Sequence, residues 1–172
     1  MAMTELQKLM PVGPRELSTA LRFWLAHNAR AMAPLVLWNV TPHNRTAAIC
    51  GIHYQAGAAL RQMVSVSAAQ EWKAANAEIR KLATEERGVL AVRDFNRGSV
   101  EVQENFIQLA LEHRIKARGR GNASRLPQDW QTVILVEEEY PLQRSAPQPS
   151  QITPGPLANI HLTQRMIHLQ LR

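Results

Sequence analysis

Residues 89 to 102 read VLAVRDFNRGSVEV, and they mark the point at which the sequence pattern changes. Before this stretch, apolar residues recur at helical spacing. Within it, Val89 to Phe95 and Ser99 to Val102 read as two extended segments. Asn96 and Gly98 lie between the segments, and both residue types tolerate positive φ. The stretch therefore predicts a β-hairpin that follows a helical half of the chain.

Three helices are predicted before the hairpin, over about residues 14 to 33, 44 to 64 and 67 to 88. Each has apolar residues at helical spacing. Pro14 fits a first helical turn, where its missing N–H is not needed. Gly88 suits a left-handed stop for the third helix.

A short apolar run, Leu35 to Val40, connects the first two predicted helices. It is either a buried strand or a packed connection, and periodicity alone does not separate the two. Within the second helix, Thr46-Ala47, Gly51-Ile52 and Gln55-Ala56 faintly resemble the helix-turn-helix of phage repressors. Gly57 departs from that pattern, and one continuous amphipathic helix is the simpler account.

The C-terminal half of the chain favours strands. Ile107 to Lys116 alternates apolar and polar residues as a strand does, although a helix through Phe106 and Ala110 also fits. Thr132 to Val136 is a β-branched run typical of a strand. Ile160 to Leu171 predicts an edge strand, on its own sheet or on that of a neighbouring copy.

This order of elements predicts an α+β fold, with the N-terminal helices packed on an antiparallel sheet of about four strands. Residues 1–140 are expected to form a single domain. Residues 141–158 carry five of the ten prolines and are expected to form a linker or long loop. Residues 159–172 form the C-terminal strand of this scheme.

Most of the net charge lies in one short stretch. The chain has a formal charge of +6, and five positive charges lie between residues 114 and 125 with no acidic residue among them: Arg114, Lys116, Arg118, Arg120 and Arg125. Arginine can bind two phosphate oxygens at once, and the glycines of this stretch allow close approach of the backbone. No aromatic residue is interleaved, so contact with nucleic acid would be to the phosphate backbone and tolerant of sequence.

Motifs that would indicate an enzyme are missing. The sequence contains no Gly-x-Ser-x-Gly, no glycine-rich phosphate loop and no His-Glu-x-x-His, so no catalytic residue is assigned. Cys50 and His53 are three residues apart, but zinc needs two further ligands, and neither a metal nor a cofactor is predicted. His161 and His168 do not form an evident pair. No segment is long and apolar enough to cross a membrane, and the expected location is the cytoplasm.

The sequence thus predicts a non-catalytic nucleic-acid-associated protein that binds through the basic stretch. The alternative is a structural subunit of a larger assembly, such as a phage particle. Expected partners are nucleic acid or an acidic protein surface. A homo-oligomer or membership of a larger assembly is also expected, through intermolecular pairing of the C-terminal strand.

Overall fold

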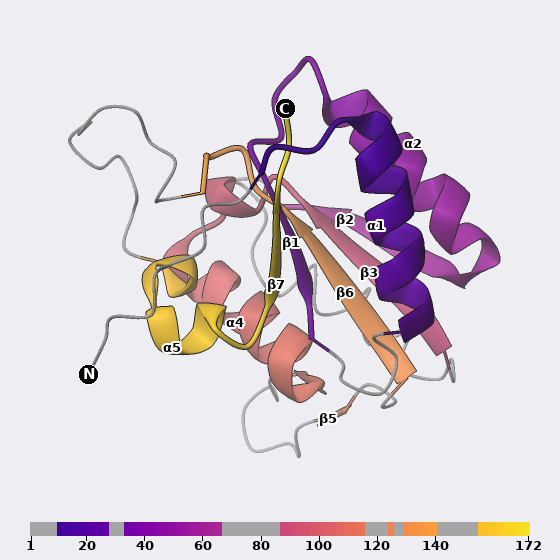
Figure 1. Cartoon of the computed structure of the whole chain (residues 1–172). Helices are drawn as coiled ribbons and strands as arrows, with labels where there is room; N and C mark the ends of the chain where they lie inside the picture. The colour runs from indigo at the N-terminus through magenta and orange to yellow at the C-terminus, as the bar shows by residue number, and fades with distance from the viewer. Residues whose placement is uncertain (1–9, 28–32, 67–86, 116–123, 126–128, 141–154) are drawn as a thin grey trace, which may run out of the picture.

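The centre of the molecule is a five-stranded sheet in which every strand runs parallel to its neighbours, in the order β2-β3-β6-β1-β7 (Figure 1). This computed structural model describes residues 10–27, 33–66, 87–115, 124–125, 129–140 and 155–172. The strands of the sheet are β1 (Leu35–Trp38), β2 (Leu60–Ser65), β3 (Arg87–Arg93), β6 (Asp129–Leu135) and β7 (Ile167–Gln170). The predicted α+β fold with an antiparallel sheet is therefore wrong, and the fold is α/β.

The central strands contribute side chains alternately to two separate core layers. In β3, Val89 and Ala91 lie in one apolar cluster, and Leu90 and Val92 lie in the other. The same alternation holds in β1 and β6. Strands that are buried on both faces read as continuous apolar runs, without the polar alternation of a half-exposed antiparallel sheet. This is why the run at Leu35–Trp38 is a buried strand and not a connection.

Helices cover both faces of the sheet (Figure 1). Helices α1 (Pro14–His27) and α2 (Arg45–Ala56) pack on one face through buried residues that include Leu21, Trp24 and Ile52. Helix α4 (Val100–Glu112) packs on the opposite face, where the short α5 (Ile160–Thr163) also lies. The parallel ladders require such crossovers, because consecutive parallel strands cannot be joined by a tight turn.

The predicted hairpin at residues 89 to 102 is wrong. The strand ends at Arg93, a 3-10 turn spans Phe95–Arg97, and α4 begins at Val100 with Ser99 as its N-cap, whose Oγ accepts a hydrogen bond from the Val102 amide at 3.2 Å. Gly98 has φ −72°, so it does not supply positive φ. A Cβ at Gly98 would lie 2.5 Å from Cγ1 of Val66, so the glycine allows close packing against the end of β2.

The favoured strand at residues 107 to 116 is also wrong, because α4 continues to Glu112 and ends at His113 in the left-handed conformation. Val102, Phe106 and Leu109 are buried on its inner side. Apolar residues occupy consecutive positions in part of this helix, and so they mimic strand alternation when every second residue is read.

Other boundaries shift for local reasons. The second predicted helix stops at Ala56, because Gly57 adopts φ +53°, and residues 60 to 65 form β2 instead. The first predicted helix is α1, and its last predicted residues lie outside the described part of the chain. The third predicted helix also lies outside it, except that Arg87 and Gly88 belong to β3. The tail that was predicted as one strand, residues 160 to 171, forms helix α5 and then strand β7. Strand β7 pairs with β1 of the same chain.

The strand predicted at residues 132 to 136 is confirmed as β6. A two-stranded antiparallel ladder, β4 (Arg114–Ile115) with β5 (Ser124–Arg125), lies outside the main sheet.

Hydrogen bonds in a cluster of Trp38, Tyr140 and His168 fix the tautomer of His168, which lies on β7. Trp38 Nε1 donates a hydrogen bond to His168 Nδ1 at 3.0 Å, so Nε2 carries the proton and donates to the Thr163 carbonyl at 2.7 Å. The Tyr140 and His168 ring centroids are 5.5 Å apart. Burial lowers the pKa of His168 from its ordinary 6.5, opposed by the hydrogen bond to Thr163. A second proton on His168 would make Nδ1 a donor, and it would then face the N–H donor of the Trp38 indole.

We predict that truncation of Phe106 shows whether residues 107 to 112 belong to a helix or to a strand. Phe106 is 1% exposed, so Phe106→Ala should lower the free energy of unfolding by about 3 to 5 kcal/mol. Gln108 is exposed on α4, and Gln108→Ala should change it by less than about 0.5 kcal/mol. In a strand the two residues would share one face, so equal losses in chemical denaturation would contradict the helix.

We further predict that stability falls on acidification through His168. Its folded pKa lies below the unfolded value of 6.5, so between these two values the unfolded chain binds more protons. The contribution of neutral His168 to the free energy of unfolding is therefore present above pH 6.5 and is lost as the pH falls towards the folded pKa. Urea titrations at about pH 7.5 and about pH 5.5 should show a smaller loss in His168→Gln, which keeps an acceptor but does not titrate. An unchanged pH dependence in that variant would exclude His168 as the cause.

Candidate functional site at the carboxyl edge of the sheet

Polar residues follow three neighbouring strands at the same edge of the sheet. Asn39 follows β1, Asp94 follows β3 and Glu137 lies two residues after the end of β6. Helix α2 begins at this edge with Arg45. Because all the strands are parallel, their carboxyl ends meet here, and open α/β sheets bind ligands outside this edge.

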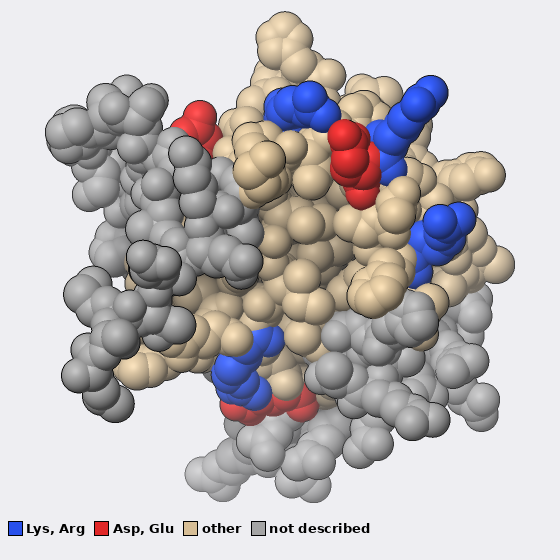
Figure 2. All heavy atoms as spheres, in the orientation of Figure 1, with Lys and Arg blue, Asp and Glu red and all other residues tan. Residues whose placement is uncertain are grey.

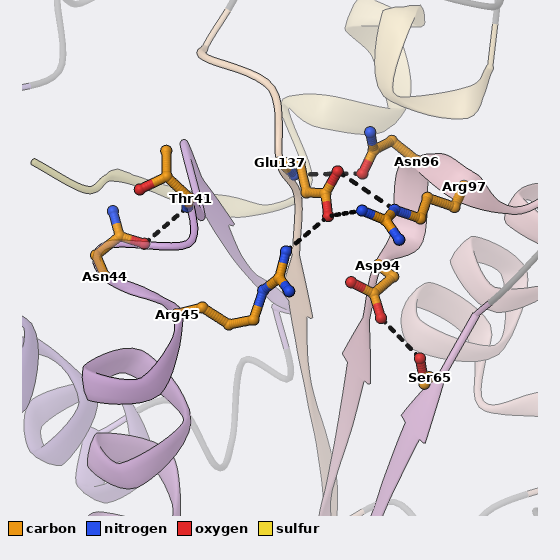
Figure 3. A network of polar contacts seen from close by, with 8 residues as sticks. All are labelled: Thr41, Asn44, Arg45, Ser65, Asp94, Asn96, Arg97 and Glu137. Atoms are coloured by element: carbon orange, nitrogen blue, oxygen red, sulfur yellow. Dashed lines mark hydrogen bonds and ion pairs between the residues drawn. The ribbon is translucent and has the colours of Figure 1, made fainter.

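The Glu137 carboxylate is held by two arginines from different elements (Figure 3). Glu137 Oε1 lies 2.9 Å from Arg45 Nη2 and 2.9 Å from Arg97 Nη2. The Glu137 backbone amide donates to Asn96 Oδ1 at 3.3 Å, which ties the end of β6 to the turn after β3. The Glu137 side chain is 26% exposed and that of Arg45 is 36% exposed, so each ion pair contributes at most about 1 kcal/mol to stability.

Asp94 lies beside this network in a left-handed conformation. It has φ 53° and ψ 34°, a region that aspartate tolerates better than most residues. Its Oδ2 accepts a hydrogen bond from Ser65 Oγ at 2.7 Å, which links the carboxyl ends of β2 and β3 (Figure 3).

The space between the start of α2 and the ends of β3 and β6 is nearly filled. It has a volume of about 10 Å³, and its walls include Arg45, Asp94 and Glu137. A cavity of about this size holds at most one water. This space is therefore too small for a phosphate group.

The loop from β1 to α2 has the spacing of a phosphate-binding loop. Residues 39 to 46 read NVTPHNRT, which places Asn39, Asn44, Arg45 and Thr46 at the glycine, glycine, lysine and threonine positions of G-x-x-x-x-G-K-[ST]. Asn39 has φ 61°, a conformation that glycine adopts freely and asparagine tolerates. A search for the motif by residue identity fails here, because both glycines and the lysine are replaced.

Five backbone amides of this loop, those of residues 39, 40, 41, 44 and 45, are already hydrogen-bonded within the protein. In a glycine-rich phosphate loop such amides point at the phosphates. Here the amides of residues 39 and 40 donate to carbonyls beyond β6, and those of residues 44 and 45 donate to the Thr41 carbonyl. The Thr41 amide donates to Asn44 Oδ1 at 2.8 Å. A larger part in holding an anion therefore falls to side chains of this edge, among them those of Arg45 and Arg97.

The asparagines also tie the loop to the C-terminal residues. Asn39 Nδ2 donates to the Leu171 carbonyl at 2.9 Å, and Asn44 Nδ2 donates to the Arg172 carbonyl at 2.9 Å. Glycine could make neither bond, and this accounts for asparagine at both positions.

The residues that the sequence predicted for binding lie elsewhere. Arg114 pairs with Arg125 in the β4–β5 ladder, whereas Lys116, Arg118 and Arg120 lie outside the described residues. Figure 2 shows the described basic side chains of one face scattered near its rim, without one continuous patch. The binding role assigned to these five residues stays a prediction.

The other candidate residues are separated too. Cys50 and His53 are both exposed on α2, whereas His161 lies on α5 and His168 on β7. Among the residues that the structure describes, no three His, Cys, Asp or Glu side chains are grouped to hold a metal ion. No helix in this described part has the length and hydrophobicity needed to cross a bilayer. The predicted cytoplasmic location and oligomeric assembly stay predictions.

No family model and no curated protein matches the chain. Solved structures match its fold. A mutant of RuvB from Thermotoga maritima aligns with a TM-score of 0.53 and 16% identity, over 94% of this chain and 46% of that one. NtrX from Brucella abortus in complex with ATP aligns with a TM-score of 0.52 and 14% identity, over 97% of this chain and 37% of that one. The chain thus spans less than half the length of either protein.

These structures correct the functional predictions made from the sequence. The expected non-catalytic nucleic-acid-associated protein was argued from the basic stretch and the missing enzyme motifs, and the alternative of a structural subunit from the C-terminal strand. The structural matches include structures with bound nucleotide and contradict those expectations, including the expectation that the protein is not an enzyme. At such low identity the likeness concerns the fold alone, which in this chain is an α/β fold with a five-stranded parallel sheet.

Proposed function

We propose that this chain is a nucleotide-binding protein whose phosphate site is the carboxyl edge of its parallel sheet. The observation that carries the proposal is the position of Arg45. It is the first residue of α2, follows the loop after β1, and directs its guanidinium to the end of β6. A cation at this point of an open parallel sheet is well placed to bind phosphate oxygens, which arginine can grip in pairs.

Arg97 supports the proposal from the opposite side of the site. Its guanidinium lies 2.9 Å from the same Glu137 oxygen that Arg45 contacts. The site therefore contains two arginines that share one exchangeable carboxylate, and Arg93 lines the same space. Because five of the loop amides are engaged elsewhere, binding depends on these side chains more strongly than it would in a glycine-rich loop.

Asp94 supplies a carboxylate beside the two arginines. Nucleotide phosphates usually bring Mg²⁺, which takes one or two protein carboxylates and keeps several waters. In the described network Asp94 bonds the neutral hydroxyl of Ser65, so its charge is not matched there by an arginine. Asp94 fits a metal ion that arrives with the nucleotide.

Calorimetric titration with ATP and with ADP, each with Mg²⁺, tests the proposal. We expect saturable binding to the wild-type chain and a loss of at least about tenfold in affinity in Arg45→Ala, since one charge-assisted contact is worth about 1.5 to 3 kcal/mol. Arg22→Ala removes the same charge from an exposed position on α1 and should bind as the wild type does.

Arg45→Lys keeps the charge and should retain part of the affinity. The unfolding curve of each variant shows whether it is folded. Absence of heat with both nucleotides in the folded wild-type chain, or equal affinity in Arg45→Ala, would contradict the proposal.

A further inference from the structure

The contacts of Glu137 show that its carboxylate holds the two cations of the proposed phosphate site. Arg45 and Arg97 reach it from α2 and from the turn after β3, and both approach the same oxygen at 2.9 Å. A second contact joins Arg97 Nε to Glu137 Oε2 at 3.4 Å. Both carboxylate oxygens are therefore engaged, and one anionic group bridges two guanidinium groups that come from separate elements (Figure 3).

Two guanidinium groups that converge on one anion form a site for a group of higher charge. A terminal phosphate carries nearly two negative charges and presents three oxygens. It can replace the carboxylate on both arginines at once, because guanidinium binds phosphate and carboxylate in the same forked geometry.

The space beside the ion pairs offers no other position for a phosphate. Only about 10 Å³ is left between the arginine, the aspartate and the glutamate that line it, which is far less than a phosphate group needs. The Glu137 backbone is fixed by Asn96, but its side chain is 26% exposed and has solvent into which it can turn. The carboxylate can therefore leave without movement of β6.

Resting on the proposed nucleotide binding, we propose that Glu137 is an internal competitor that keeps the phosphate site closed until a terminal phosphate displaces it. The ligand class is a nucleoside di- or triphosphate, whose terminal phosphate has three free oxygens, and the competing group belongs to the protein itself. The apparent affinity is then the intrinsic affinity reduced by the fraction of molecules in which Glu137 has left the arginines.

Glu137→Gln tests the competition, because glutamine has the size of glutamate without its charge. We expect ATP to bind this variant at least about tenfold more tightly than the wild type, a gain of about 1.4 kcal/mol. Glu139→Gln removes the same charge from an exposed residue two positions further along and should leave the affinity within about twofold of the wild type, since exposed charges are screened by salt.

The gain should also depend on the arginine that the glutamate occupies. In the Arg45→Ala background, Glu137→Gln should raise affinity by much less than it does in the wild type, because the competed cation is absent. Calorimetry with ATP on the four proteins of this cycle measures the coupling, and unfolding curves confirm that each protein is folded.

The outcomes separate the two proposals. Wild-type binding that Glu137→Gln leaves unchanged or weakens would overturn the competitor while nucleotide binding stands. Equal gains in Glu137→Gln and Glu139→Gln would reduce the effect to net charge and would also overturn it. Absence of binding in both the wild type and Glu137→Gln would overturn both proposals.

Discussion

A parallel ladder between neighbouring strands is the constraint on which the rest of this molecule depends. Two parallel strands cannot be joined by a tight turn, so each strand must be followed by a crossover that returns the chain to the starting edge. The crossovers place α2 on one face and α4 on the other. Helix α1, which precedes β1, packs on the same face as α2, and the central strands are buried on both sides. The same constraint brings the carboxyl ends of β1, β3 and β6 together, and Asn39, Asp94 and Glu137 meet there.

The carboxyl edge combines a loop of familiar spacing with unfamiliar residues. Asparagine at positions 39 and 44 tolerates the required backbone, and it adds side-chain bonds to the C-terminal residues that glycine could not make. Arginine at position 45 brings a longer, forked cation, which reaches Glu137 beyond the end of β6. Each of these residues adds a contact between the loop and a neighbouring part of the chain. Five backbone amides of the loop are hydrogen-bonded within the protein, and the arginines pair with a carboxylate.

Local signals in the sequence predicted some elements well. Pro14 marked the start of α1, and the β-branched run from Thr132 identified β6. Local signals did not show that the strands are parallel. A strand that is buried on both faces and a short apolar connection have the same run of apolar residues, so periodicity does not separate them. Helix α4 was misread, since its apolar residues also alternate. The site depends on which strand ends become neighbours, and topology decides this. The one local signal of the site in the sequence was the spacing from Asn39 to Thr46.

The position of β1 has a consequence for the synthesis of this protein. Its two hydrogen-bonded neighbours, β6 and β7, both come from the C-terminal half of the chain. A nascent chain therefore carries Leu35–Trp38 with both strand edges unpaired until Asp129–Leu135 has left the ribosome. An apolar strand in that condition is a template for aggregation and a natural target for chaperones. Folding of the whole sheet must wait for contacts between distant parts of the chain, which makes this topology slow to form.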